Sequence, residues 1–376
     1  MRGARAPGTA RQPRTAMPLI WCSISGHGFG HAAQVAPVLN ELGRLVPGLK
    51  AILRTKVPPW FFENRLTIPW KLSQAEQDIG CVQRGPLALD VSATWTEHLR
   101  FHKDWETKVG DEARAIQSAA PDLVLSDISH LAIEAGATAK KRTVGLCNLS
   151  WDRVLEPFLQ PGVPEQIKTL QQIEQSYSMA ELLIRPAPSV PMKAFPNIVD
   201  IGPIRQPTPP NQRALREAIE ATPKEHVVLI AFGGVPLDSL PLEKLEQLAG
   251  YRFVVSGPVP EACRRIRSHS SIPLPFNVLI ASADLIVTKP GYSTVVEAVT
   301  HRKPVMYVRR YNFADEAYLV EYLHRYGRAA ELSAEDFTAG RWEQTLNAVW
   351  AAPHPKDESP PASGAAEAAE ILAKYL

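Results

Sequence analysis

Two histidines and three glycines share one short turn near the start of the chain: His27 and His31 alternate there with Gly26, Gly28 and Gly30. Glycines let a backbone approach a ligand closely, and a helix that follows presents its positive N-terminus. An imidazole at a cleft edge can serve as general base, or it can cap the helix or satisfy a core hydrogen bond. We favour the base, with His31 ahead of His27. A dinucleotide site is disfavoured because the third glycine comes one position early.

A carboxylate stands at the end of the buried strand expected over residues 121–127. Asp127 closes this strand directly after Ser126. A carboxylate in that place can orient a histidine and stabilise its protonated form. It can equally cap the helix expected over residues 130–140, and the sequence leaves both roles open.

A second glycine turn, in the later half of the chain, is typical of anion binding. Gly291 permits close approach, and Lys289 adds a positive charge in front of a helix N-terminus. Ser293 and Thr294 offer hydroxyl groups. The alternative is an ordinary strand-to-helix turn with a capping serine, and the combination favours the anion site. Glu297, one turn into the helix, can accept hydrogen bonds from a ribose diol or can be a surface glutamate.

Two further groups of residues follow strands of the second half, where they can contact the same anionic ligand. Gly233 and Gly234 follow an apolar strand, where backbone N–H groups can cradle phosphate. After a later strand, Arg309 and Arg310 can meet a phosphate or a carboxylate. Asp315 and Glu316 can bind sugar hydroxyls. A solvated cluster of charges is an equal alternative for these last four residues.

Composition and missing motifs exclude several classes of protein. The chain has 376 residues, 45% of them hydrophobic, and a net charge of +2, so it should fold, and it lacks the basic footprint of a nucleic-acid binder. No apolar run reaches the roughly 18 residues that span a bilayer. The aromatic residues 60–62 leave peripheral membrane contact open, although a core edge is favoured.

No third ligand accompanies His98 and His102, so we expect no metal and no other cofactor. Four cysteines without metal spacing favour the cytoplasm.

Strands and helices alternate in two series, which predicts the α/β class. In the first half, strands are expected over residues 18–24, 50–55, 121–127, 143–148 and 181–186. In the second half they are expected over residues 226–235, 251–258 and 303–310, and residues 276–299 are expected to form a strand, a turn and a helix. This pattern suggests two Rossmann-like parallel-sheet domains facing a cleft, with ligands outside the carboxyl ends of the strands.

These motifs resemble the GT-B glycosyltransferases. The second half is similar to the donor domain of the group that contains the lipid-linked GlcNAc transferase of peptidoglycan synthesis. A closer resemblance, over about residues 17–350, is to the glycosyltransferase-like N-terminal region of plant arabinokinases. It rests on residues 26–32, 78–83, 289–310 and 313–316. No sugar-kinase region follows, so kinase activity is not expected.

The resemblance implies GT-B architecture and a role for each candidate residue. A nucleotide-sugar, with a UDP-sugar favoured, would bind the C-terminal domain, and the acceptor would bind the N-terminal domain without a metal. His31 would be the base, with Asp127 as partner and His27 as competitor. Donor contacts would come from Gly233, Gly234, Phe276, Lys289, Gly291, Tyr292, Ser293, Thr294, Glu297, Arg309, Asp315 and Glu316.

Four parts are therefore expected along the chain. They are a disordered basic leader over residues 1–16, an acceptor-side domain over 17–204, a donor domain over 205–350, and a proline-rich segment with a final helix over 351–376 that packs back on the N-terminal domain. We expect a metal-independent, inverting hexosyltransferase that acts on an unidentified acceptor hydroxyl. Nucleotide-sugar binding without turnover and nucleotide-sugar epimerisation are the alternatives.

Overall fold

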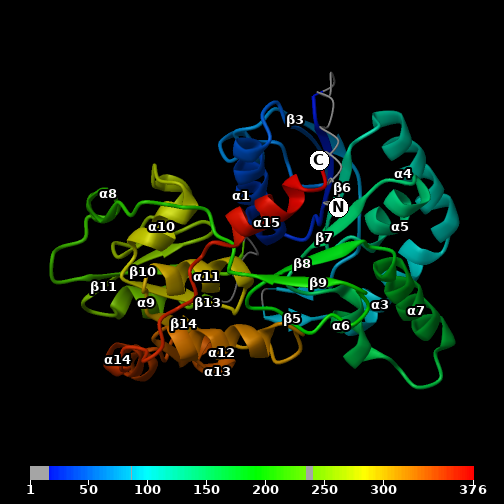
Figure 1. The fold of residues 1–376 in the computed structure, drawn as a ribbon. Coiled ribbons are helices and arrows are strands. Elements are labelled where there is room, and N and C mark those ends of the chain that lie inside the picture. Colours follow the sequence, from blue (N-terminus) through cyan, green and yellow to red (C-terminus); the bar gives the residue numbers. More distant parts are fainter. Residues whose placement is uncertain (1–16, 86, 234–239) are drawn as a thin grey trace, which may run out of the picture.

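Two parallel sheets, each covered by helices, make up the chain in the computed structural model (Figure 1). The structure describes residues 17–85, 87–233 and 240–376, so the expected leader over residues 1–16 and the candidate Gly234 lie outside the described residues. The two sheets confirm the predicted α/β class. In the described part of the chain, no helix combines the length and the apolar character needed to cross a membrane.

The first sheet has seven parallel strands in the order β3-β2-β1-β6-β7-β8-β9. The strands are β1 (Leu19–Ile24), β2 (Lys50–Thr55), β3 (Trp70–Gln74), β6 (Leu123–Asp127), β7 (Thr143–Leu146), β8 (Leu182–Pro186) and β9 (Ile198–Ile201). The helices of this half are α1 (Gly30–Leu45), α2 (Trp60–Glu63), α3 (Val91–His102), α4 (Trp105–Ala119), α5 (His130–Thr138), α6 (Trp151–Leu155) and α7 (Pro164–Ser178). A small antiparallel hairpin, β4 (Gln83–Arg84) and β5 (Ala88–Leu89), stands apart from the sheet.

The second sheet has six parallel strands in the order β12-β11-β10-β13-β14-β15. The strands are β10 (His226–Ala231), β11 (Tyr251–Val255), β12 (Ile266–Ser268), β13 (Leu285–Thr288), β14 (Val305–Tyr307) and β15 (Ala329–Glu331). The helices that follow the first sheet are α8 (Gln212–Ala218), α9 (Leu242–Gln247), α10 (Phe276–Ser282), α11 (Tyr292–Thr300), α12 (Glu316–Tyr326), α13 (Ala334–Ala339), α14 (Glu343–Ala351) and α15 (Gly364–Ala373).

The central strand β10 shows why an apolar run becomes a parallel strand here. Val227 and Leu229 pack into the core on one face of the sheet, which includes side chains of α11. Val228 and Ile230 pack into the core on the other face, which includes side chains of α14. Because side chains alternate between faces, a strand covered on both sides must be apolar throughout. Each such buried side chain contributes about 1.5–3 kcal/mol.

One predicted strand is a helix. Residues 276–282 form α10, and the strand of this region is β13, which begins at Leu285. A short apolar run has no periodicity that separates a buried strand from a buried helix. In α10 the buried residues are consecutive and lie at the helix end, from Leu279 to Ser282.

The last helix returns to the first half of the chain. α15 lies beside α1 (Figure 1), and Ala368 and Leu372 share one apolar core with Leu39 of α1. The chain enters α15 through a close approach, in which the Gly364 N–H donates to the Pro203 carbonyl oxygen at 3.1 Å. A Cβ atom at Gly364 would overlap the backbone of Gly202, so this contact requires a glycine.

Candidate active site between the two sheets

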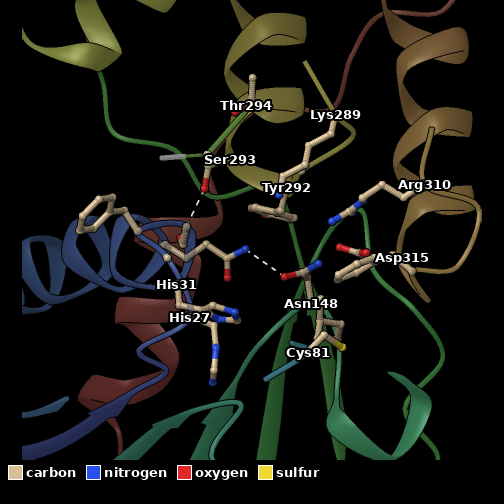
Figure 2. Close-up of a pocket in the computed structure, with 18 of the residues that line it drawn as sticks. His27, His31, Cys81, Asn148, Lys289, Tyr292, Ser293, Thr294, Arg310 and Asp315 are labelled. Atoms are coloured by element: carbon tan, nitrogen blue, oxygen red, sulfur yellow. Dashed lines mark hydrogen bonds between the residues drawn. The ribbon is translucent and has the colours of Figure 1, made fainter. Parts of the chain in front are cut away.

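One cavity of about 220 Å³ lies between the two halves of the molecule (Figure 2). It is formed by the turn after β1, the loops after β7 and β13, and the segment after β14. Its lining includes eleven of the residues singled out from the sequence, which are His27, Gly28, Gly30, His31, Gly233, Lys289, Gly291, Tyr292, Ser293, Thr294 and Asp315. The carboxyl ends of both sheets thus meet at a common site, as expected for this class of fold.

His31 and Asp127 form a direct pair on the first-sheet side. Strand pairing sets Asp127 beside Ile24, so both strands end at the start of the glycine turn. His31 Nδ1 lies 3.0 Å from Asp127 Oδ1, and the Ser25 N–H donates to the other carboxylate oxygen at 3.2 Å. Since Nδ1 is engaged by the carboxylate, Nε2 is the ring nitrogen of His31 that can act on a ligand.

The environment of His31 raises its pKa to about 9. Burial by itself lowers the pKa of an imidazole, because it disfavours the charged form. The carboxylate of Asp127 outweighs this through its charge and hydrogen bond, and the charges of Asp78 and Asp315 add to it. The imidazolium form of His31 is therefore stabilised in the folded protein.

His27 occupies a different environment in the same turn. Its Nε2 accepts a hydrogen bond from the Gly80 N–H and lies 3.9 Å from Asp78 Oδ1. A Cβ atom at Gly80 would overlap the imidazole ring, so the contact requires a glycine there. The Trp151 ring meets the imidazole edge-on at 5.9 Å, and its Nε1–H donates to Asp78 Oδ2 at 3.0 Å. His27 is thus fixed as part of the cavity wall.

The second-sheet side of the cavity presents the N-terminus of α11. Gly291 is the N-cap residue in extended backbone, and the Ser293 hydroxyl donates to the Gly30 carbonyl oxygen across the cavity at 3.4 Å (Figure 2). The Tyr292 hydroxyl accepts from the Ile204 N–H at 2.9 Å and donates to the Ala187 carbonyl oxygen at 3.0 Å. Tyr292 therefore ties α11 to the segment that joins the two sheets.

Two cationic side chains stand beside this helix end. Burial and the charge of Arg310 lower the pKa of Lys289 to about 8. Lys289 Nζ donates to Gln83 of the hairpin at 3.4 Å. The Arg310 guanidinium lies over the Phe313 ring at 3.5 Å and donates to the Pro290 carbonyl oxygen at 3.0 Å. Helix N–H groups, hydroxyls and two cations together are suited to an anionic ligand.

The neighbouring carboxylates Asp315 and Glu316 have different surroundings. Asp315 lines the cavity, and burial raises its pKa against the opposing charge of Arg310. Glu316 is buried outside the cavity lining and accepts from the backbone N–H groups of Arg310 and Tyr311 at 2.9 and 3.0 Å. Arg309 also donates to Glu316 at 3.1 Å. The structure therefore assigns Glu316 and Arg309 to holding the segment after β14, and Arg310 reaches the cavity.

Other residues singled out from the sequence are not part of the cavity lining. Gly26 precedes the lining residues of the first turn, and Phe276 meets the His269 ring edge-on at 6.0 Å. Glu297 is buried, with Oε2 3.4 Å from His301 Nε2. This Oε2 accepts no hydrogen bond from any residue that the structure describes.

Several lining residues were missed by the sequence analysis. They include Phe29, Gln34, Cys81, Gln83, Asn148, Leu149, Trp151, Val154 and Phe313. Gln34 follows His31 by three residues and so shares its helix face, and Asn148 closes the strand expected over residues 143–148. Burial raises the pKa of Cys81 to about 12, which disfavours its thiolate.

The histidine pair considered for a metal belongs to a buried aromatic stack. His102 Nε2 lies 3.0 Å from His130 Nε2, and the two rings stack at 5.0 Å. Burial lowers the pKa of His98 to about 3 and that of His102 to about 4. Among the described residues, no group of three or more His, Cys, Asp or Glu side chains is arranged to hold a metal ion.

The chain is similar in sequence to part of a much longer protein. No family model matches it. It is 27% identical over 330 residues to the L-arabinokinase of Arabidopsis thaliana, a match that covers 86% of this chain and 31% of that protein. The chain thus spans about a third of the length of the curated relative that it matches.

Solved structures show the same arrangement of two sheets. The glycotransferase of kitacinnamycin matches with a TM-score of 0.61 at 14% identity, over 96% of this chain and 100% of that chain. A UDP-glucosyltransferase from Polygonum tinctorium that glucosylates indoxyl matches with a TM-score of 0.57 at 15% identity, over 96% and 98%. The chain has the GT-B glycosyltransferase fold, as its sequence predicted.

Proposed function

We propose that this chain of GT-B fold transfers a sugar from a nucleoside-diphosphate sugar to a hydroxyl group of an acceptor. One observation carries the proposal. His31, held by Asp127, and the N-terminus of α11, with Lys289 beside it, line the same cavity from opposite halves of the molecule. A base on one side and an anion site on the other suit a displacement at a carbon that carries a diphosphate leaving group.

In the proposed reaction, His31 Nε2 takes the proton of the acceptor hydroxyl. The hydroxyl oxygen forms its bond to the anomeric carbon while the bond to the diphosphate oxygen breaks, and the diphosphate keeps the electron pair. Attack opposite the leaving group inverts the anomeric carbon. Asp127 balances the charge of the imidazolium. The backbone N–H groups and hydroxyls at the start of α11, together with Lys289 and Arg310, meet the charge on the diphosphate. These groups supply the role of a metal, so the proposed transfer is metal-independent.

A UDP-sugar is our preferred donor. The Polygonum tinctorium neighbour is named a UDP-glucosyltransferase. Glu297 is proposed to hold the ribose, because it lies one helical turn beyond Ser293 and its Oε2 has no hydrogen-bond partner among the residues that the structure describes. Asp315, in the cavity lining, is proposed to contact hydroxyls of the donor sugar. We place the reaction in the cytoplasm.

Nucleotide-sugar binding without turnover is a second candidate, and one observation favours it. With a pKa of about 9, His31 is mostly imidazolium at neutral pH, and an imidazolium binds anions but accepts no proton. The two candidates therefore share the donor site and differ in the need for a neutral His31.

A nucleotide titration followed by a turnover assay tests both candidates. The full chain is titrated with UDP, UDP-glucose, dTDP and ADP, and thermal unfolding is recorded. Ligand at about 100 times its Kd should add about 2.7 kcal/mol of stability. Release of the nucleoside diphosphate from the bound sugar at pH 9, with water or a hydroxyl compound as acceptor, supports transfer. Binding with no release at any pH supports the binding module, and no binding by any of the four contradicts both.

A further inference from the structure

Two buried amides in the cavity lining each keep one unused polar atom. Gln34 and Asn148 are 3% and 2% exposed. The Gln34 Nε2–H donates to Asn148 Oδ1 at 3.0 Å, which joins α1 to the loop after β7 (Figure 2). Gln34 Oε1 and Asn148 Nδ2 have no hydrogen-bond partner within residues 17–85, 87–233 and 240–376. Buried polar atoms are normally paired, so this pair is incomplete without a ligand.

The unused atoms define the chemistry of that ligand. The pair offers one acceptor, Gln34 Oε1, and one donor, Asn148 Nδ2. If both amides were turned over, the pair would still offer one donor and one acceptor. Two adjacent hydroxyl groups can satisfy both, because each hydroxyl donates and accepts. A carboxylate only accepts, and an apolar ring does neither.

The amide pair lies on the same side of the cavity as the candidate base. Gln34 follows His31 by one helical turn, and Asn148 follows β7, the neighbour of the strand that ends in Asp127. The Asn148 backbone oxygen accepts from the Val190 N–H at 3.0 Å, which fixes the loop. Figure 2 shows Asp315 approaching the cavity from the opposite half, facing Asn148. The pair thus belongs to the half that the proposed function gives to the acceptor.

The remaining wall of the cavity on this side suits a sugar. Trp151 gives its indole N–H to Asp78, so only its ring is left for a ligand, and a flat aromatic surface packs against the C–H face of a sugar.

We propose that Gln34 and Asn148 bind two adjacent hydroxyls of the acceptor, and that the acceptor is a free sugar or polyol. This inference rests on the proposed function, because the ligand is an acceptor only if the chain transfers a sugar. The binding of the ligand itself can be measured without turnover. The two amides act as binding and specificity residues, and His31 stays the base.

Ligand-observed NMR tests the proposal with and without saturating UDP. The probes are glucose, arabinose, xylose and myo-inositol, the matched compounds 2-deoxyglucose and 3-deoxyglucose, and 4-nitrophenol as an apolar acceptor. We expect at least one sugar or polyol to bind, and removal of one hydroxyl from the bound diol to weaken binding at least about tenfold, because a buried amide is then left unpaired. Absence of binding by every sugar and polyol, or binding by 4-nitrophenol alone, overturns the proposal.

Near-isosteric variants locate the binding. Gln34→Met and Asn148→Leu should each raise the Kd of the bound sugar at least about tenfold while leaving the Kd of UDP unchanged. Gln117→Met, at an exposed position of α4, is the matched control. Unchanged sugar affinity in both variants contradicts the assignment. Failure of wild-type protein to bind UDP, with sugar binding retained, would instead contradict the proposed function.

Discussion

The two histidines of the glycine turn differ in how each meets a buried aspartate. His31 Nδ1 lies 3.0 Å from Asp127, whereas His27 Nε2 lies 3.9 Å from Asp78. The second carboxylate accepts from the Trp151 indole, and burial raises its pKa. His31 and Asp127 therefore form a direct ion pair. Asp78 instead accepts from Trp151 and only lies near His27, whose Nε2 already accepts the Gly80 N–H.

This difference shows that proximity of a histidine and an aspartate in a cleft is insufficient for base chemistry. The direct contact fixes which ring nitrogen carries the proton and stabilises the imidazolium that forms after proton transfer. At His27 the nitrogen nearer the carboxylate is used by Gly80. The comparison therefore predicts unequal effects of matched substitutions at the two pairs.

Removing the imidazoles should give the largest difference. His31→Ala should lower kcat/KM for sugar transfer by about 10²–10⁴-fold, the usual contribution of a positioned base. His27→Ala should lower it less than about tenfold, because only a wall contact is lost. The measurement is nucleotide release at saturating donor, with the Kd of UDP as the control, which we expect to stay within about twofold in both variants. Equal losses in both variants would break the distinction between the pairs.

Removing the carboxylates should separate the pairs by pH dependence. If neutral His31 is the active form, wild-type kcat at saturating donor, where the bound diphosphate keeps Lys289 protonated, should rise with pH to a plateau above about pH 9. Asp127→Asn removes the main influence that raises the pKa of His31 and leaves burial opposed only by the weaker charges of Asp78 and Asp315, so the midpoint of the rise should fall by more than one pH unit, toward the ordinary imidazole value of about 6.5. Asp78→Asn should shift the midpoint much less, because Asp78 acts on His31 only through a weaker charge interaction.

The free energy of unfolding should depend on pH because of the same His31 titration. The pKa of His31 in the folded protein lies above the unfolded value of about 6.5. The stabilisation of the fold by the His31 imidazolium is therefore fully present below pH 6.5 and is lost as pH rises through 9. Urea unfolding at pH 6 and pH 9.5 should show this loss in wild type and not in Asp127→Asn. Identical profiles of the two proteins would show that Asp127 leaves the His31 proton unaffected.

The sequence was sufficient for the parts of the site that follow from local patterns. Glycine turns after apolar strands located the turn of His31 and the start of α11, and a parallel sheet brings the ends of such strands to one edge. The sequence placed Asp127 at the end of a buried strand but left open whether it is a partner of His31 or a helix cap, and the pairing of this strand with β1 brings it to the glycine turn.

Other parts depend on contacts between distant segments. Gln34 and Asn148 are 114 residues apart and carry no local signal of their mutual hydrogen bond. Asp315 and Glu316 look alike in the sequence. Only the path of the chain after β14 directs one into the cavity and the other onto backbone N–H groups. The prediction that residues 276–299 begin with a strand was wrong, since residues 276–282 form α10, because a short buried run has no distinguishing period.

Gly80→Ala should give the smallest effect on activity and tests whether His27 is only a wall. The added Cβ would overlap the His27 ring, so the imidazole or the loop that contains Asp78 must shift. We expect a loss of about 1–3 kcal/mol in the free energy of unfolding, as for other overpacked sites, measured by urea denaturation. Because the His31–Asp127 contact is made by other segments, the midpoint of the pH profile of kcat at saturating donor should stay near pH 9. A shift of that midpoint by more than about one pH unit would mean that the two pairs are coupled through Asp78, and that the base extends across both histidines.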